Sequence, residues 1–323
     1  PVPKASPCST ACLAGTDVRG MVALLGQREK LGLSIDEACE RAWHLVVETN
    51  PFPATTGRIC PHRCEENCNR HQKDGGVAVG SLERFIGDWG LEHEMALPGR
   101  PDHPMHPEKI AIIGAGPAGL SCAYQLMRRG YASTIFESMP QPGGMLRYGI
   151  PAYRLPARVL EGEIWRILGL GVELRTKTMI GRDVSLDELR QQYAAVFVAP
   201  GAAASRNIDI PGVPGPGVYR AVEFLREVAR RGPPAMGQRV VIVGGGNTAI
   251  DAARVCARVL GGKGVITLLR QENQNVDDDL REAMEEGVSV EFLATLNSVV
   301  RTANQEVSHV VVQKIELGEK DAQ

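Results

Sequence analysis

Residues 109–137 read KIAIIGAGPAGLSCAYQLMRRGYASTIFE, and this stretch decides the fold. Its first part, 109–113, is a short apolar run of the kind that forms a buried parallel strand. The turn Gly114-Ala-Gly116-Pro-Ala-Gly119 comes next and leads into a helical pattern. A second strand is predicted at 133–136 and ends at Glu137. The order of strand, glycine turn, helix and strand predicts a βαβ unit.

The glycine turn predicts a phosphate-binding site. The first glycine permits the tight turn, the second lets the backbone approach a pyrophosphate, and the third lets helix and strand pack closely. The helix N-terminus adds free N–H groups and a positive dipole end. Glu137 falls about 20 residues downstream, where such folds place a carboxylate against ribose hydroxyls. We therefore expect FAD or NAD to contact Gly114, Gly116, Pro117, Ala118, Gly119 and Glu137.

Length and composition limit the class of protein. The 323 residues allow about two domains of ordinary size, and 43% hydrophobic residues are enough to form their cores. A net charge of −2 gives no basic surface for nucleic acid, and no run approaches the roughly 18 apolar residues of a membrane span. The first residues, PVPKASP, lack the pattern of a secretory signal. We expect a cytoplasmic protein.

The eight cysteines are unevenly distributed. Five lie near the start of the chain, at Cys8, Cys12, Cys60, Cys64 and Cys68, and the single residues Cys39, Cys122 and Cys256 lie inside helical patterns. In a cytoplasmic enzyme such a cluster indicates metal or redox chemistry more often than disulfides. The single cysteines are typical of core packing.

Residues 8–93 predict a small helical domain. The sequence Ser34-Ile-Asp-Glu37 has the spacing of a capping box and predicts a helix over about 34–48. If this helix folds back, the segment Cys60-Pro-His-Arg-Cys64-Glu-Glu-Asn-Cys68 can meet Cys8-x3-Cys12. Such a group of thiolates suits an iron–sulfur cluster. Structural zinc, and thiols without a metal, are the alternatives.

The glycine-rich and proline-rich segment 142–156, PGGMLRYGIPAYRLP, follows the first βαβ unit. It is too irregular for a core element, so we expect it to lie along the flat face of a cofactor, with a surface crossover as the alternative. A helix at 157–168, a short strand at 172–174 and the segment 194–201, AAVFVAPG, continue the α/β alternation. The predicted cofactor contacts in this part are Gly143, Gly144, Met145, Leu146, Arg147, Ile150, Arg154, Ala199 and Gly201.

Residues 238–249, QRVVIVGGGNTA, repeat the strand and glycine turn, and a helix at 247–260 and a strand at 265–269 follow. Two such patterns in one chain predict two separate dinucleotide sites. The predicted contacts of the second are Gly244, Gly246, Asn247, Thr248, Ala249, Asp251 and Arg270. Arg270 stands where the first copy has Glu137, and arginine can pair with a 2′-phosphate that glutamate would repel. FAD is expected at the first site and NADP(H) at the second, with NAD(H) as the alternative because Gln271 adds no second charge.

With these motifs in this order, the chain resembles the small subunit of glutamate synthase. It is also similar to the N-terminal half of dihydropyrimidine dehydrogenase and to the large subunit of the NADH-dependent ferredoxin:NADP oxidoreductases. The resemblance covers essentially the whole chain. It implies FAD, NAD(P)H and [4Fe–4S] clusters that pass electrons to a partner subunit, domain or protein.

The resemblance also implies a ligand set. The flavin-proximal cluster of the family would take Cys12, Cys60 and Cys64, with Glu83 of Ser81-Leu-Glu83 as a non-cysteine fourth ligand. A solvated carboxylate on a helix surface is the alternative for Glu83. Cys8 and Cys68 match ligands of a second cluster, but Pro3 and the chain start occupy the places of its upstream cysteine pair, so Cys68 could instead complete the first cluster.

The expected fold class is α/β, with two Rossmann-like dinucleotide-binding domains preceded by a small all-helical iron–sulfur domain. The predicted limits are 1–97 for the helical domain, 98–107 for a proline-rich linker, 108–235 for the FAD domain and 236–323 for the NAD(P) domain. The resemblance implies a further segment that completes the FAD domain, and we do not expect it within these 323 residues. We expect either a piece of a longer polypeptide or completion by another chain.

The predicted function is electron transfer from NAD(P)H through FAD and an iron–sulfur cluster to a redox partner, so no acid–base catalyst is nominated. The loop after Glu137 has no Cys-x4-Cys, so the redox disulfide of glutathione reductase-like flavoenzymes is not expected. One rival is a flavin oxidase or monooxygenase with structural zinc. The other is a scaffold that keeps the fold but binds no flavin.

Overall fold

The computed structural model describes residues 6–99, 105–202, 204, 205, 209–271, 276–316 and 318. The chain forms two compact units, the first from residues 1–147 and 152–201 and the second from 148–151 and 202–323. This division differs from the three predicted domains, whose limits stay a prediction. Within the predicted linker, residues 100–104 lie outside the described part of the chain.

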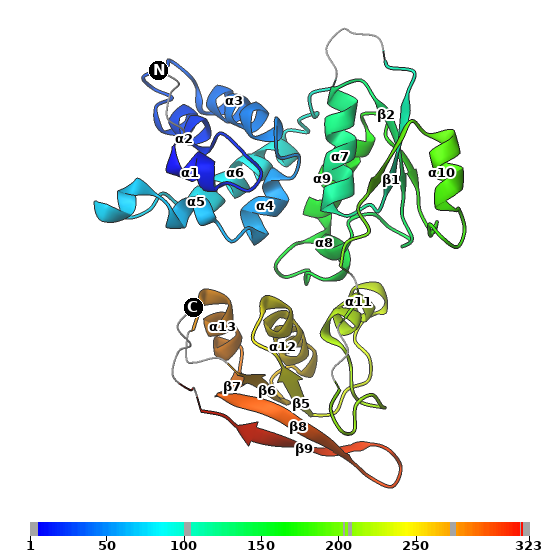
Figure 1. The fold of residues 1–323 in the computed structure, drawn as a ribbon. Helices are drawn as coiled ribbons and strands as arrows, with labels where there is room; N and C mark the ends of the chain where they lie inside the picture. Colours follow the sequence, from blue (N-terminus) through cyan, green and yellow to red (C-terminus); the bar gives the residue numbers. More distant parts are fainter. Residues whose placement is uncertain are drawn as a thin grey trace. The chain divides into compact units, whose positions relative to one another are not determined.

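The first unit begins with short helices (Figure 1). They are α1 (Pro7–Ala11), α2 (Val18–Gly26), α3 (Ile35–Val47), α4 (Pro53–Ile59), α5 (Arg63–Glu66), the 3-10 turn η1 (Asn69–Gln72) and α6 (Val79–Glu92). The predicted capping box at α3 is confirmed, because Ser34 and Glu37 each bond the backbone N–H of the other. Trp43 on this helix is fully buried and anchors the helical core.

Helices α4 and α6 pack so closely that glycine is required on both. A Cβ at Gly57 of α4 would overlap the backbone of Arg84, and a Cβ at Gly87 of α6 would overlap the backbone of Ala54. A bidentate ion pair between Arg58 and Asp88, with both N–O distances at 2.8 Å, joins the same two helices. The pair therefore forms a rigid base for the residues that follow α4.

A four-stranded parallel sheet with the order β3-β2-β1-β4 completes the first unit. Its strands are β1 (Lys109–Ile113), β2 (Ala132–Phe136), β3 (Glu173–Arg175) and β4 (Ala195–Val198), and its helices are α7 (Pro117–Arg128), α8 (Met145–Tyr148), α9 (Ala157–Leu168) and α10 (Leu186–Gln192). Figure 1 shows α7 on one face of the sheet, with α9 beside it, and α10 on the other face. The predicted βαβ unit is confirmed, with Lys109 paired to Ala132 in register.

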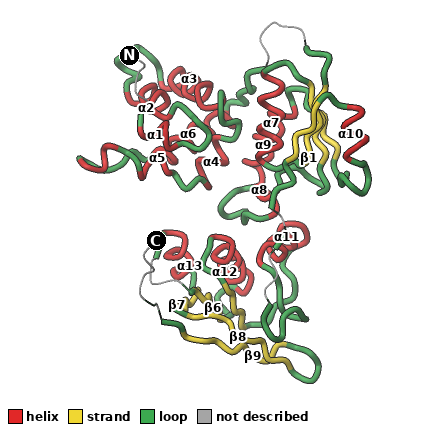
Figure 2. Tube along the Cα trace, viewed as in Figure 1, coloured by secondary structure: helices red, strands yellow, loops and turns green. Residues whose placement is uncertain are grey.

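The second unit contains the parallel sheet β5-β6-β7 and the antiparallel hairpin β8-β9. Figure 2 draws strands in yellow. The strands are β5 (Arg239–Val243), β6 (Val265–Arg270), β7 (Val288–Phe292), β8 (Ala294–Arg301) and β9 (Val307–Lys314), and the helices are α11 (Ala221–Arg231), α12 (Asn247–Leu260) and α13 (Asp278–Glu285). The buried Arg254 of α12 pairs with Glu282 and Glu286 at 2.8 and 2.6 Å and joins this helix to α13 and its end. Within the described residues, we find no helix with the length and apolar character needed to span a membrane.

Candidate functional site

The first glycine turn is built from positions that tolerate no side chain. Gly114 has φ +102°, and a Cβ there would overlap the carbonyl oxygen of Ala199, which follows β4. A Cβ at Gly119 would overlap the carbonyl oxygen of Gly114. Strand, turn and helix therefore approach each other at the closest distance that the backbone allows.

Gly116, by contrast, faces open space. A Cβ there would meet a single atom within 4 Å, the Cα of Gly144 at 3.9 Å. Gly116 is also the N-cap of α7, and no side chain caps this helix. The first-turn residues Pro117 and Ala118 thus begin a helix whose N-terminus is open to a ligand, which fits a bound pyrophosphate.

Glu137 lies beside this turn at the carboxyl end of β2 and is 6% exposed. Its carboxylate accepts hydrogen bonds from the backbone N–H of Ala115 and of Met139, both at 2.7 Å. These bonds fix the carboxylate next to the glycine turn. The position fits the predicted contact with a ribose, and the contact itself stays a prediction.

The segment 142–156 docks on the same turn. The N–H of Gly143 donates to the carbonyl oxygen of Ala115 at 2.7 Å. Gly144 has φ +53°, and a Cβ there would lie 2.7 Å from the Cα of Gly116. Met145 and Leu146 form part of the one-turn helix α8, so this segment is more regular than the sequence predicted.

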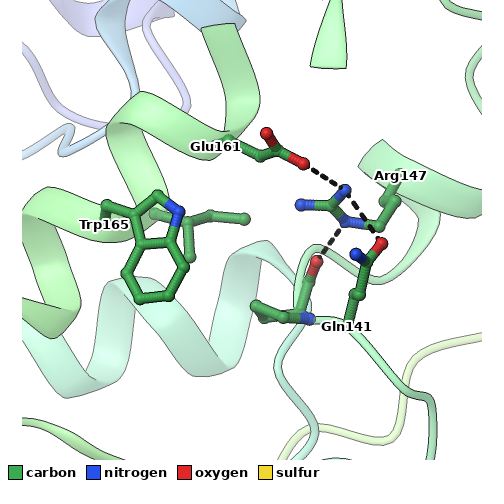
Figure 3. A pocket seen from close by; sticks show the side chains of 6 residues that line it. Gln141, Arg147, Glu161 and Trp165 are labelled. Atoms are coloured by element: carbon green, nitrogen blue, oxygen red, sulfur yellow. Dashed lines mark hydrogen bonds and ion pairs between the residues drawn. The ribbon is translucent and has the colours of Figure 1, made fainter. Parts of the chain in front are cut away.

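Arg147 is held by its own segment and by α9. Its Nε donates to the Pro142 carbonyl at 2.6 Å, and its Nη1 donates to Glu161 at 2.9 Å and to Gln141 at 3.2 Å. Figure 3 shows this guanidinium group between Glu161 and Gln141, with Trp165 projecting from α9 nearby. The pocket that these residues line has a volume of about 80 Å³, too small for a flavin ring. Arg147 therefore fastens the segment to α9, and direct contact with a cofactor stays a prediction.

The remaining predicted contacts of the first site are more dispersed. Ala199 touches the glycine turn through its carbonyl, and Gly201 follows it with φ +71°. Ile150 belongs to the second compact unit, and Arg154 belongs to the first. Their roles stay predictions.

The second glycine turn has the same plan. Gly244 has φ +142°, and Gly246 is the uncapped N-cap of α12, with no atom within 4 Å of the space that a Cβ would fill. Asn247, Thr248 and Ala249 form the first turn of the helix, and Asp251 is buried one turn later. This arrangement also fits a dinucleotide phosphate.

Arg270 is the last residue of β6 and is 4% exposed. The adjacent Gln271 donates from Nε2 to Thr295 Oγ1 at 2.8 Å, so its side chain is fixed to β8. Residues 272–275, which follow, lie outside the described residues. The choice between NADP(H) and NAD(H) therefore stays a prediction.

The cysteines of the first unit lie at the ends of short helices. Cys12 is the C-cap of α1, Cys60 is the C-cap of α4, and Cys64 is buried on α5. Figure 1 shows α1, α4 and α5 gathered at one part of this unit. Burial, followed by the negative charges of Glu65, Cys60 and Cys12, raises the pKa of Cys64 to about 11. Burial raises the pKa of Cys60 as well, and the charges of Glu83, Cys12 and Glu65 add to it.

The charges of Cys12 and Cys60 act on Cys64, and the charge of Cys12 acts on Cys60, so these three thiols lie near one another. Because burial and these charges oppose the ionisation of Cys60 and Cys64, a positively charged centre such as a metal cluster would favour their thiolate forms. In the described part of the chain, no three His, Cys, Asp or Glu side chains converge tightly enough for a single metal ion. A [4Fe–4S] cluster needs a wider arrangement because each cysteine binds a different iron. The backbone N–H of His62 also donates to Cys60 Sγ at 3.4 Å, a kind of bond that tunes cluster potentials.

The other two cysteines of the group are less clearly placed. Cys68 is the N-cap of η1, and Cys8 lies on α1 with its sulfur 3.2 Å from Ser6 Oγ. Neither is among the groups whose charge acts on Cys60 or Cys64. Whether either one binds iron stays a prediction.

Glu83 is half-buried on α6 and is not a solvated surface carboxylate. Its Oε1 accepts hydrogen bonds from Asn50 Nδ2 at 2.9 Å and from Thr56 Oγ1 at 3.1 Å. Burial raises the pKa of Glu83, and these two bonds lower it. Sequence reasoning missed Asn50 and Thr56, which hold this carboxylate beside Cys60.

Sequence reasoning also missed another buried carboxylate, Glu163 on α9. It is fully buried and is bonded to the N-terminus of α4, the helix that Cys60 caps. The sequence carried one signal, because Glu163 interrupts an otherwise apolar helix face.

Comparisons with known proteins agree with this organisation. Residues 3–95 match the family described as dihydropyrimidine dehydrogenase domain II, 4Fe–4S cluster. The NADPH-Fe(3+) oxidoreductase subunit beta of Geobacter sulfurreducens is 38% identical over 98% of this chain and 47% of its own length. The glutamate synthase NADPH small chain of Escherichia coli is 36% identical over 87% of this chain and 62% of its own. The chain thus spans about half to two-thirds of the length of these relatives.

Among solved structures, Mycobacterium tuberculosis FprA in complex with NADPH superposes with a TM-score of 0.56 at 18% identity, covering 67% of this chain and 66% of FprA. This likeness concerns the fold alone. The comparisons confirm the predicted resemblance and the predicted cofactor classes, which are FAD, a pyridine nucleotide and a 4Fe–4S cluster. Residues 108–321 match the pyridine nucleotide-disulphide oxidoreductase family, and the chain belongs to that family.

Proposed function

We propose that the protein transfers electrons from NADPH through FAD and a [4Fe–4S] cluster to a partner protein. When bound, FAD accepts a hydride, and an iron–sulfur cluster carries electrons singly. The names of two relatives include NADPH as the donor. Arg270 supports the same donor, since its positive charge stands where a 2′-phosphate would require one.

The role of the chain's own residues would be to bind and orient the cofactors. The turn at Gly116 and the start of α7 would hold the FAD pyrophosphate, and Glu137 would hold a ribose hydroxyl. The turn at Gly246 would hold the NADPH pyrophosphate at the start of α12. Each helix would supply backbone N–H groups to the pyrophosphate, and Arg270 would add a positive charge for the 2′-phosphate at the second site.

At the cluster site, the proposed ligands are Cys12, Cys60, Cys64 and Glu83, with Cys68 as the alternative fourth ligand. Asn50 and Thr56 would orient Glu83 toward Cys60. Oε1 of Glu83 accepts both of their hydrogen bonds, and this leaves Oε2 available for iron.

One observation carries the proposal: the cysteine group and the first glycine turn belong to the same compact unit. Helix α9, which holds the segment at Arg147, also packs against α4 and α6. A thiolate centre and a flavin site on one rigid scaffold suit electron transfer between them. Structural zinc or a non-catalytic role would not require the two sites to share one unit.

The test is cofactor analysis of protein purified without oxygen. We expect FAD together with about four iron and four sulfide per chain. Cys60→Ser should lower iron and sulfide and leave FAD in place, whereas Cys256→Ala, in the second unit, should change neither. Zinc without sulfide in the wild-type protein would contradict the cluster, and absence of flavin after reconstitution would contradict the electron path.

For the electron acceptor, we propose only a class of molecule. It is a redox protein or subunit, because the names of two relatives describe them as a subunit beta and a small chain. A cytoplasmic location, predicted from the sequence, is part of the same proposal. Co-purification of the native complex, followed by mass spectrometry, would identify the acceptor and test whether a partner exists.

A further inference from the structure

Glu163 makes a link between two distant parts of the first unit. Its side chain is fully buried on α9, and its two carboxylate oxygens accept hydrogen bonds from the backbone N–H groups of Ala54 and Thr55 at 2.7 and 3.0 Å. These donors belong to the first turn of α4, where helix N–H groups have no partner within the helix. The N-cap residue Phe52 offers no side-chain bond. Glu163, far away in the sequence, therefore caps α4.

The opposite end of α4 is the cysteine site. The helix is seven residues long, so it spans about 10 Å, and Cys60 is its C-cap. The intrahelical hydrogen bonds of so short a helix hold its two ends in a fixed relation to each other. Any displacement of the N-terminal end of α4, which Glu163 caps, is therefore transmitted to Cys60 at the other end.

Arg166, one turn beyond Glu163, holds the neighbouring helix. It donates to the carbonyl oxygen of Gly90 on α6, and its guanidinium group lies over the ring of Trp43 at 5.5 Å. Helix α6 carries Glu83. Two successive turns of α9 thus grip the two helices that present Cys60 and Glu83.

We propose that Glu163 is a positioning residue that fixes the cluster-bearing end of α4 at a set distance from the flavin site. This inference rests on the proposed function. Helix α9 packs against α7, the helix of the first glycine turn, so it connects the two sites directly. Electron transfer depends steeply on distance, and small displacements in an active site commonly have large effects on rate.

The test uses Glu163→Gln. A glutamine side chain has the same size, but it offers one oxygen acceptor, and its NH₂ group would face the other backbone N–H. We expect backbone amides of 54–60 to exchange with deuterium about tenfold faster or more than in the wild type. Glu188→Gln is the matched control, since Glu188 caps its own helix α10 elsewhere in the unit. It should leave exchange in 54–60 unchanged.

Rapid-mixing kinetics supply the second readout. In the variant, flavin reduction by NADPH should keep its rate, while the following reduction of the iron–sulfur cluster should slow by about tenfold or more. A purely structural defect would lower both steps or the cofactor content. Unchanged exchange at 54–60, or an unchanged rate of cluster reduction in a fully loaded variant, would overturn the proposal.

A second variant and a cofactor-independent measurement cover the cases of misfolding and of missing cofactors. If Glu163→Gln does not fold, Glu163→Asp keeps the carboxyl group and shortens the side chain by one methylene, and the same two results are expected of it. If the wild-type protein binds no flavin or no cluster, the proposed function fails by that result. Amide exchange on the same protein still measures whether Glu163 holds α4.

Discussion

The buried carboxyl of Glu163 should make the stability of the first unit depend on pH. Burial raises the pKa of Glu163 from an ordinary value of 4.5 to about 7, against the opposing effects of its bonds to Thr55 and Ala54 and of the Arg166 charge. At roughly 1.36 kcal/mol per pH unit, this interval corresponds to about 3 kcal/mol. Glu163→Gln removes the titrating group and so should abolish this component.

The direction follows from the raised pKa. The native protein retains the proton on Glu163 at pH values where the unfolded chain has lost it. The stabilisation is therefore fully present below pH 4.5 and is lost as the pH rises through about 7. The difference in unfolding free energy between wild type and Glu163→Gln should fall by up to about 3 kcal/mol across this range. Any pH-independent cost of the substitution shifts this difference by a constant and leaves its slope intact.

Urea unfolding followed by tryptophan fluorescence is the appropriate assay. The three tryptophans of the chain, Trp43, Trp89 and Trp165, all belong to the first unit, so the signal reports that unit alone. As a control, Glu188→Gln should show no such fall between pH 4.5 and 7. Hydrogen bonds from Ser185 lower the pKa of Glu188, so its contribution is present above the ordinary value of 4.5 and is lost only as the pH falls below it. A flat difference between wild type and Glu163→Gln from pH 4.5 to 7 would refute the reasoning.

Four further outcomes are expected. Gly87→Ala should cost roughly 1–3 kcal/mol in urea unfolding, because its Cβ would overlap the backbone of α4, whereas Gly26→Ala, with no atom within 4 Å of the new methyl group, should cost nothing. Gly119→Ala should abolish FAD retention, measured by absorbance after gel filtration, and a fully yellow variant would contradict the assigned turn. Arg270→Glu should raise the KM for NADPH by about tenfold or more while sparing NADH, and equal effects on both would argue against a 2′-phosphate contact. Asn50→Ala should lower the iron content per chain by releasing Glu83, and unchanged iron would remove Glu83 from the ligand set.

Local patterns predicted the dinucleotide-binding elements well. The helix expected at 247–260 is α12 with the same limits, and the helix expected at 157–168 is α9. In both, the signal is contained within a few consecutive residues: a glycine turn in one and an apolar periodicity in the other. The capping box at Ser34 is local in the same way. Such elements can be predicted because no distant residue is needed to specify them.

The surroundings of the site could not be predicted in the same way. Spacing indicated that Cys12 and Cys60 meet, but the bonds from Asn50 and Thr56 to Glu83 depend on how α4 and α6 pack. That packing is set by Gly57 and Gly87, which lie on separate helices. A glycine inside a helix signals close approach without naming the partner. Which helix such a glycine approaches can be seen only in the folded structure.

The sequence does carry a signal for Glu163, which is a charged residue on an otherwise apolar helix face. Its neighbours Val159, Leu160, Ile164 and Ile167 form the buried face of α9, and Glu163 falls on that same face. A glutamate is almost never fully buried unless something binds it, so its presence in an apolar stripe requires a donor in the core. The donor here is the N-terminus of α4, the one part of a helix that offers free N–H groups to a carboxylate. In this chain, Glu163 on the buried face of α9 therefore marks where the α/β part is fastened to the helical part.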